Sequence, residues 1–492
     1  MLLFAFACVP SGVCPEGGCE DAPGDTAGHL VGDPPSVAAP GEDEASEIVL
    51  TLELSDAMPT AVVATWSVPE GSTSWLEIDG REAVYGEGLS ELVVLAPQDS
   101  AVSARVVAEL DGERVTSAWS SVVTERFEAP IDVPVEVHDA SRSWIAGELF
   151  QFVYEGDDRR AVGLVRGDGE LIWYLDGSAL GNTDPVSGQV SLDGRGMLVG
   201  MWQGRSGDLR LTLDEMEDNA IWLFGWDGHP ILTLDTPRGH HLFDQPEPGV
   251  ITWSSVEPVL REGDLLPVAF ERLMVSEIGG SDWLAFDSTV LDYQEACENG
   301  GFYVDACDVH HANSMDCDLD GGSCLFNLKN TAQVLEVSIG GGVMDDFALW
   351  PTVDHLGRRV MGFQQAHDIH WGADGSLLVF NDGENGAWAS RLLIDREAHT
   401  LTETWSYGRE KCIQANALGT VQELDNGNYL VGFSTPNNVL REVTEGGDVV
   451  WESDLGGLDE GERCGLEQLE MVLGEARALS VQSLGSGVVV LD

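Results

Sequence analysis

The segment GADGSLLVFND, Gly372 to Asp382, decides the fold because a tight turn leads directly into a short apolar strand. Similar phrases recur as SLDGRGMLVGM, ELDNGNYLVGF and SLGSGVVVLD. A second phrase, in which an acidic turn leads into a strand with tryptophan, recurs as RGDGELIWYLD, TEGGDVVWESD and DREAHTLTETWSY. Asn-Gly and Asp-Gly suit such hairpins because the central turn positions need positive φ. Irregular hairpin repeats over roughly 360 residues, 126–492, predict a β-propeller of about six blades.

The region before these repeats, 47–125, predicts a second all-β domain. Short runs such as IVLTLEL, AVVATWSV and SARVVAEL alternate apolar and polar residues and are separated by Gly, Pro, Asp and Ser. Alternation with a period of two at this spacing is typical of an antiparallel sandwich. With Trp66 early and Tyr85 midway, the region resembles a fibronectin type III-like domain. We expect a spacer or docking module, followed by the propeller.

The charge of the chain limits its partners. The 492 residues include 85 acidic and 24 basic residues, which leaves a net charge of -61. Such a surface repels nucleic acid and anionic membranes, so nucleic-acid partners are not expected. Only two lysines occur, Lys329 and Lys411.

The first residues predict export. MLLFAFAC is an apolar run that ends in Cys8, and a tract rich in Gly, Pro and acidic residues follows over 9–46. Residues 1–8 resemble the end of a bacterial lipoprotein signal. We therefore expect a periplasmic or cell-surface protein with a lipid on Cys8 as its membrane attachment. No other stretch approaches the ~20 apolar residues of a membrane-spanning helix.

The cysteines predict disulfides and no structural metal. Eight of the nine remain when Cys8 is reserved for lipid, and an even number suits an exported chain. Cys297, Cys307, Cys317 and Cys324 lie close together, but they lack the short paired spacing that structural zinc sites favour. Disulfides that brace an inserted loop are the preferred interpretation.

Three histidine clusters precede strands of the propeller. RGHHLFDQPEPGVITW contains His240 and His241, VHHANSMDCDLDGGSCLFNLKN contains His311, and QQAHDIHWGADGSLLVFNDG contains His367. Residues just before the inner strand of each blade line one mouth of the central channel. If His241, His311 and His367 hold equivalent places in three blades, their imidazoles converge there.

These segments resemble the bacterial arylsulfotransferase family, in which a six-bladed propeller follows a small β-sandwich. The resemblance is carried by the His-His pair at His240, by the His-x-Asn-Ser segment at His311 and by the later Ala-His-Asp segment. It implies that His367 is the nucleophile and that His241 and His311 bind the sulfate. Asn313 would add a polar contact. The resemblance covers 225–452, and more loosely the order of the two domains.

The implied reaction moves a sulfuryl group from an aryl sulfate to a phenolic acceptor without a cofactor. Sulfuryl transfer resembles phosphoryl transfer, and a neutral imidazole can carry the group as a sulfohistidine. Either Asp368 or a nearby backbone carbonyl would fix the tautomer of His367. Lys329 stands where the family has arginine, which keeps the charge but loses the two-pronged fork.

Two alternatives remain open. One is a metalloenzyme, because clustered imidazoles suit zinc, copper and iron. The other is a binding or scaffold propeller with a degenerate site, which the replacement of arginine by Lys329 would permit. The oligomeric state is not predicted.

Overall fold

The computed structural model describes residues 48–491 except for several short segments. These segments are 80–83, 86–89, 129–131, 157–159, 181–182, 204–211, 292–302, 384–385, 410–412, 414, 416–417, 435–437, 456–470, 481–483 and 485–487. The predicted lipoprotein signal with Cys8 and the tract over 9–46 lie outside the described residues. Within the described part, no helix has the length and apolar character needed to span a membrane.

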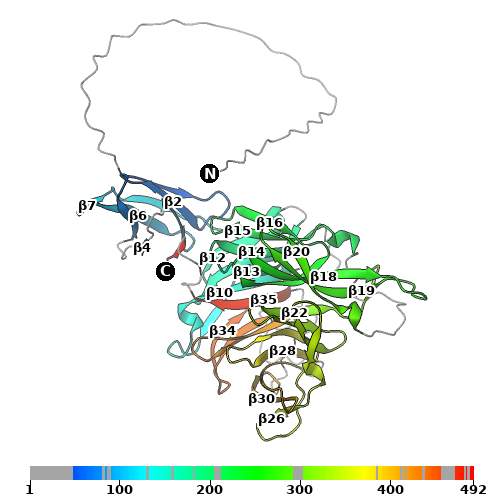
Figure 1. Ribbon diagram of the computed structural model, residues 1–492. Coiled ribbons are helices and arrows are strands. Elements are labelled where there is room, and N and C mark those ends of the chain that lie inside the picture. Colours follow the sequence, from blue (N-terminus) through cyan, green and yellow to red (C-terminus); the bar gives the residue numbers. More distant parts are fainter. Residues whose placement is uncertain are drawn as a thin grey trace, which may run out of the picture. The chain divides into compact units, whose positions relative to one another are not determined.

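The fold is all-β, as predicted, and begins with a small β-sandwich (Figure 1). One sheet has the order β1-β2-β5-β36 and the other β4-β3-β6-β7, with β8 also paired to β6. The strands are β1 (Val49–Leu54), β2 (Ala61–Ser67), β3 (Thr73–Ile78), β4 (Val84–Tyr85), β5 (Glu91–Leu95), β6 (Ala101–Leu110), β7 (Glu113–Thr116), β8 (Ser120–Val123) and β36 (Val488–Val490). Alternate side chains such as Val62, Ala64 and Trp66 fill the core between the sheets.

Six further sheets form the blades of the propeller. Blade 1 consists of β35 (Met471–Leu479), β10 (Leu149–Gly156), β11 (Arg160–Arg166) and β12 (Leu171–Asp176). Blade 2 consists of β13 (Thr183–Val190), β14 (Gly196–Gln203), β15 (Ala220–Gly225) and β16 (Pro230–Asp235). Blade 3 consists of β17 (Gly239–Glu247), β18 (Val250–Val259), β19 (Val268–Glu277) and β20 (Asp282–Asp287), with β21 (Cys307–Asp308) paired to β19.

The other three blades follow the same plan. Blade 4 consists of β22 (Ala312–Asp318), β23 (Ser323–Leu328), β24 (Gln333–Ser338) and β25 (Val343–Asp346). Blade 5 consists of β27 (Ala366–Trp371), β28 (Leu377–Gly383), β29 (Gly386–Asp395), β30 (Thr400–Tyr407) and β26 (Thr352–Asp354). Blade 6 consists of β31 (Gly419–Glu423), β32 (Tyr429–Phe433), β33 (Val439–Val443), β34 (Val449–Asp454) and β9 (Val135–Val137). Short 3-10 helices are η1 (Ile145–Gly147), η2 (Gly177–Leu180), η3 (Asp214–Met216), η4 (Ser288–Val290) and η5 (Phe347–Leu349).

The two repeated phrases have constant places in the blades. The phrase at Gly372 turns from the innermost strand to the second, and the acidic phrases turn from the third strand to the fourth. Gly375 has a φ of 78° and Gly427 a φ of 79°, the positive values that these turns require. All three tryptophans of the acidic phrases are buried, and Trp173 and Trp451 are fully buried. Turn chemistry and a buried anchor therefore define each blade.

The innermost strands form a closed ring around the channel. In order, β13, β17, β22, β27, β31 and β35 each contact the next, and β35 contacts β13. Blade 1 closes the ring by combining strands from both ends of the propeller, since β35 pairs with β10 in antiparallel fashion (Figure 1). The closing strand β35 therefore comes from the C-terminal part of the propeller sequence.

The last repeat phrase, 483–492, was predicted to be a propeller strand, and this was wrong. Its strand β36 pairs in parallel with β5 of the sandwich, where Val489 faces Val94. The physical reason is that β35 already occupies the inner edge of blade 1. The apolar run VVV completes the sandwich sheet instead, and Leu491 enters the sandwich core.

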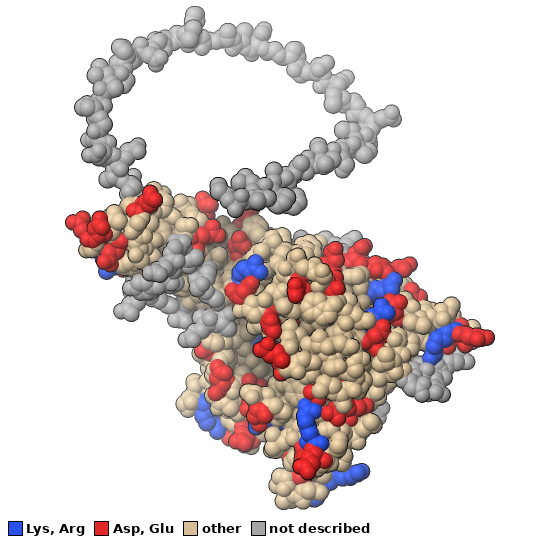
Figure 2. All heavy atoms as spheres, viewed as in Figure 1, with Lys and Arg blue, Asp and Glu red and all other residues tan. Residues whose placement is uncertain are grey.

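A disulfide joins Cys317 and Cys324, which face each other across β22 and β23. A disulfide was predicted here, but it links neighbouring strands of a blade and does not brace an inserted loop. Cys307 is also disulfide-bonded. Figure 2 shows acidic side chains spread over the visible face, where basic ones are fewer, as the net charge of -61 implies.

Candidate functional site

His367 and Asn313 hold equivalent positions in neighbouring blades. In blade 5, Ala366 pairs with Asn381 and Asp368 with Phe380, so His367 is an extra residue in its strand. In blade 4, Ala312 pairs with Leu328 and Ser314 with Asn327, so Asn313 is extra in the same way. Such β-bulges re-aim a side chain and are frequent beside active sites. The inner strands thus present an imidazole and an amide from matching bulges.

The residue two places earlier has a left-handed backbone in three successive blades. The φ values are 57° at Arg238, 51° at His311 and 47° at Gln365. His311 is therefore the counterpart of Gln365, and the predicted equivalence of His311 with His367 was wrong. The counterpart of His367 in blade 3 is His240, which follows Gly239 as His367 follows Ala366. Periodicity along the sequence could not reveal this offset.

The structure brings His240 and His311 into contact. Their rings meet edge to face with centroids 5.2 Å apart. The side chain of His241, the predicted sulfate ligand, lies outside the described residues. His310 faces elsewhere, with its ring 5.7 Å from that of Phe270, and burial lowers its pKa to about 4. Of the adjacent histidine pair in blade 4, it is His311 that joins this site.

Two buried carboxyl groups that the sequence did not single out hold these imidazoles. Asp308 Oδ2 accepts a hydrogen bond from His311 Nδ1 at 2.7 Å, and the pKa of Asp308 is lowered by this bond in spite of its burial. Glu271 Oε1 lies 3.3 Å from His240 Nε2 and also accepts the Ala312 amide. The short separation of three residues between Asp308 and His311 is the only sequence feature that could have indicated this pairing.

The Glu271–His240 contact has the spacing of an ion pair, but its environment favours two neutral groups. Burial lowers the pKa of His240 to about 3, and the charge of His311 adds to this effect. Burial, together with the negative charge of Asp308, raises the pKa of Glu271 well above its usual range. Taking two charges out of water costs more than their attraction usually returns. A neutral carboxyl beside a neutral imidazole is the consistent description.

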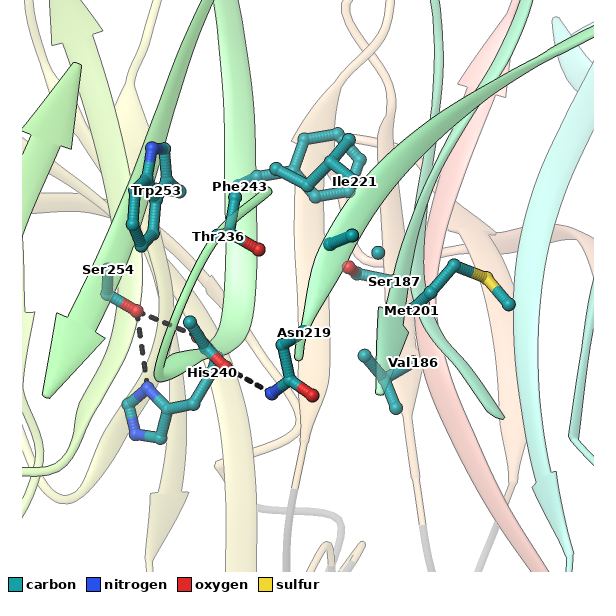
Figure 3. Close-up of a pocket in the computed structure, with 13 residues that line it drawn as sticks. Val186, Ser187, Met201, Asn219, Ile221, Thr236, His240, Phe243, Trp253 and Ser254 are labelled. Carbon is teal, nitrogen blue, oxygen red and sulfur yellow. Dashed lines mark hydrogen bonds between the residues drawn. The ribbon is translucent and has the colours of Figure 1, made fainter. Parts of the chain in front are cut away.

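Ser254 fixes the orientation of His240 (Figure 3). Its hydroxyl donates to the His240 carbonyl at 2.7 Å and lies 3.2 Å from His240 Nδ1. Because the hydroxyl proton is used on the carbonyl, Nδ1 is the donor and Nε2 carries the lone pair. Asn219 Nδ2 donates to the carbonyl of Gly239 at 2.7 Å and anchors the preceding residue. The narrow pocket beside His240 has a volume of about 20 Å³, room for one water-sized group.

His367 is buried, with 6% of its surface exposed, in a cationic environment. Burial lowers its pKa well below the usual value, and the positive charges of Lys329 and His311 lower it further. Lys329 follows directly after β23, where its amide donates to the carbonyl of His311 at 3.0 Å. The neutral form of His367, which has a free ring-nitrogen lone pair, is therefore the stable one.

Asp368, the predicted orienting group of His367, has other partners. Its Oδ2 accepts hydrogen bonds from Thr420 Oγ1 at 2.9 Å and from the Val421 amide at 3.0 Å. Its Oδ1 lies 3.5 Å from Nδ1 of His370. The carboxylate of Asp368 acts on His367 through its charge alone. In this site it is the imidazole of His311 that is hydrogen-bonded to a carboxylate, that of Asp308.

Asparagine side chains tie blade 4 to the residue before His367. Asn327 Nδ2 donates to the carbonyl of Ala366 at 2.5 Å, and Asn313 Nδ2 approaches the same oxygen at 3.4 Å. Asn313 Oδ1 is buried and has no hydrogen-bond partner among the described residues. Asn313 therefore positions the bulge of blade 5 and leaves one polar oxygen for another contact.

A separate cavity of about 230 Å³ lies further along the same inner strands. Its polar lining consists of Asp244, Asp316, Asp368, His370, Thr420, Gln422 and Arg477. The carboxylates of this lining are hydrogen-bonded; Asp316 Oδ2, for example, accepts the amide of Trp371 at 2.7 Å. The channel thus has two polar layers: a first layer that contains the imidazoles of His240, His311 and His367, and a second layer, formed by this cavity, in which carboxylates surround His370. In the part of the chain that is described, no three His, Cys, Asp or Glu side chains are grouped so as to hold a metal ion.

Comparisons with known proteins find only distant similarity to solved structures. No family model and no curated protein matches the chain. Among solved structures it is similar to a protein of unknown function from Bacteroides caccae, with 11% identity, a TM-score of 0.39 and coverage of 66% of this chain and 98% of the other. It is also similar to a periplasmic gluconolactonase from Pseudomonas aeruginosa, with 14% identity, a TM-score of 0.36 and coverage of 77% and 95%.

Proposed function

We propose that the protein transfers a sulfuryl group from an aryl sulfate to a phenolic acceptor, with His367 as the nucleophile. The observation that supports this most directly is the state of His367, a buried imidazole on a bulge whose neutral form is favoured by burial and by two cationic neighbours. A neutral imidazole is the nucleophilic form. The neighbours Lys329 and His311 carry the charge that attracts a sulfate monoester.

Each surrounding group has a task in such a transfer. The transition state is loose, with negative charge on the three equatorial oxygens. Hydrogen-bond donors and cations that face these oxygens therefore contribute most of the stabilisation of the transition state. Lys329 would supply a point charge in place of the fork of an arginine. His311, whose Nδ1 donates to Asp308, would turn its Nε2 to the sulfate, as a carboxylate orients other catalytic imidazoles. Asn313 would hold the Ala366–His367 backbone in place.

A burst experiment tests this proposal. The full chain is mixed with 4-nitrophenyl sulfate without an acceptor, and both nitrophenolate release and the mass of the His367 peptide are measured. We expect one equivalent of nitrophenolate and a sulfuryl adduct on His367, and neither in His367→Ala. The control is His370→Gln, a change three residues along the same strand, which should retain the burst.

Two outcomes would contradict the proposal. Wild-type protein that forms no adduct and moves no sulfuryl group to phenols would favour a non-catalytic propeller. Turnover that a chelator abolishes and a stoichiometric metal restores would favour the metalloenzyme alternative, since imidazole-rich sites suit transition metals.

A further inference from the structure

Asp382 occupies the place in blade 5 that Lys329 occupies in blade 4. Lys329 follows Leu328, the partner of Ala312, and Asp382 follows Asn381, the partner of Ala366. Both positions therefore lie at the end of the second strand, beside the start of the innermost strand. Since His367 is the second residue of that innermost strand in blade 5, Asp382 lies at the same end of the same hairpin.

The side chain of Asp382 is buried without the partners that the other carboxyl groups of the region have. Only 4% of its surface is exposed, and its Oδ2 has no hydrogen-bond partner among the described residues. Asp308 and Glu271 also have one such oxygen each, but their other oxygen accepts a hydrogen bond, from His311 and from the Ala312 amide. A buried polar atom without a partner is costly, by about 1 to 3 kcal/mol, and such exceptions call for an explanation.

The proposed transfer also needs a group that donates and accepts protons. When a phenolate leaves the donor it needs a proton, and when a phenol attacks it must lose one. His367 uses its lone pair on sulfur, and Lys329 serves as a fixed cation. A carboxyl group that can exist in both forms is what the two half-reactions require.

Resting on the proposed function, we infer that Asp382 is the acid–base group of the transfer, which gives its proton to the departing phenolate and takes one from the incoming phenol. In the first half-reaction, the His367 nitrogen forms a bond to sulfur and the bond from sulfur to the aryl oxygen breaks. The aryl oxygen receives the proton of Asp382 and leaves as a phenol.

The second half-reaction reverses these steps. The Asp382 carboxylate removes the proton of the acceptor phenol, whose oxygen attacks sulfur while the nitrogen–sulfur bond breaks. His367 and Asp382 both return to their neutral starting forms, so protons and electrons balance. One carboxyl that serves as acid and then as base is also the solution found in retaining glycosidases.

The titration of Asp382 suits this role. Burial raises its pKa to about 7, although the charge of Lys329 opposes the rise. A group is most effective in proton transfer when its pKa lies near the working pH. In its neutral form the carboxyl would also not repel an anionic sulfate ester.

The test separates the two half-reactions in the full-length protein. Asp382→Asn is compared with wild type for the nitrophenolate burst and for transfer to unsubstituted phenol across pH. The leaving group of 4-nitrophenyl sulfate is stable as an anion, so the burst and the His367 adduct should persist. Transfer to phenol should fall by about 10²- to 10³-fold, and the limb of the pH profile that titrates near 7 should disappear.

Asp382→Glu should restore part of the transfer and of the pH dependence, which a structural role alone would not explain. The matched control is Asp374→Asn at the opposite end of the same hairpin, where Asp374 pairs with Arg391. It should leave burst, transfer and pH profile unchanged. If Asp382→Asn transfers to phenol as fast as wild type with the same profile, or loses the nitrophenolate burst as well, the inference is overturned. A wild-type protein without a burst would instead refute the sulfuryl transfer itself.

Discussion

His367 and His370 lie three residues apart on β27, yet their environments drive their pKa values in opposite directions. Burial disfavours the charged form of both. At His367 the cations Lys329 and His311 add to this and lower the pKa further. At His370 the charge of Asp368 and the contact with it outweigh burial and raise the pKa. One strand therefore presents two imidazoles of opposite preference: the neutral form is favoured at His367 in the first layer, and the charged form is favoured at His370 in the carboxylate-lined cavity.

This contrast shows that the presence of a histidine at a given sequence position is not enough to assign its role. A nucleophilic imidazole must be neutral. Asp368 acts on His367 through its charge alone, whereas it lies 3.5 Å from Nδ1 of His370. In the second layer the imidazole of His370 lies beside Asp368, whose charge favours the protonated form. The following predictions change one layer at a time.

The largest expected effect comes from the nucleophile. His367→Ala should reduce transfer between phenols by about 10⁴- to 10⁶-fold, as the loss of other covalent nucleophiles does, and should leave the fold intact. His370→Gln should change transfer by less than about tenfold, because it removes no group from the first layer. Steady-state kinetics with 4-nitrophenyl sulfate and circular dichroism measure both. Equal losses in the two variants would remove the distinction between the layers.

Lys329 should have the next largest effect. Lys329→Ala removes a charge that acts on His367 and that the proposed function assigns to the sulfate oxygens, so we expect a loss of about 10²- to 10³-fold in kcat/KM. Lys329→Arg should keep or raise the rate, because the guanidinium retains the charge and adds the fork. NMR titration of His367 provides an independent check, since its pKa should rise when the charge of Lys329 is removed. An unchanged pKa would argue that Lys329 lies too far away to act.

Asp368 should matter for stability and its effect should depend on pH. Asp368→Asn removes the charged partner of His370, with an expected cost of about 1 to 3 kcal/mol near pH 6. A raised pKa of His370 means that its contribution is fully present below its unfolded value and is lost as pH rises through the folded value. The cost should therefore be smaller at pH 9, as urea unfolding at the two pH values would show. A larger cost at pH 9 would reverse the assigned sign.

The smallest expected effect belongs to Ser254. Ser254→Ala removes the hydroxyl that fixes the tautomer of His240, at a cost of about 1 kcal/mol and a rate loss of no more than about tenfold. Ser255→Ala, an adjacent residue whose hydroxyl bonds the Pro237 carbonyl, is the matched control. Comparison of kcat/KM for the two variants measures the difference. A loss as large as that of Lys329→Ala would make His240 a central group.

Much of the architecture could be predicted because its signals are local. Asp-Gly and Asn-Gly turns set the hairpins, and Trp173 and Trp451 mark the buried strand that follows an acidic turn. The terminal run VVV was assigned to the wrong sheet, because a local sequence pattern predicts a strand but not the sheet that the strand joins. That choice depended on whether an edge in blade 1 was free, and β35 had taken it.

The sequence by itself determined a ring of hairpin blades, the gathering of histidines at the starts of inner strands and the presence of Lys329 among them. Only the tertiary structure decided that His240 and not His311 matches His367, that Asp308 and Glu271 hold the imidazoles of His311 and His240, and that Asp382 is buried at the end of the hairpin that carries His367. The reason is physical: a one-residue bulge shifts which side chain faces the channel, and a pKa depends on burial and on charges brought from other blades. Neither is written in any single segment of the chain.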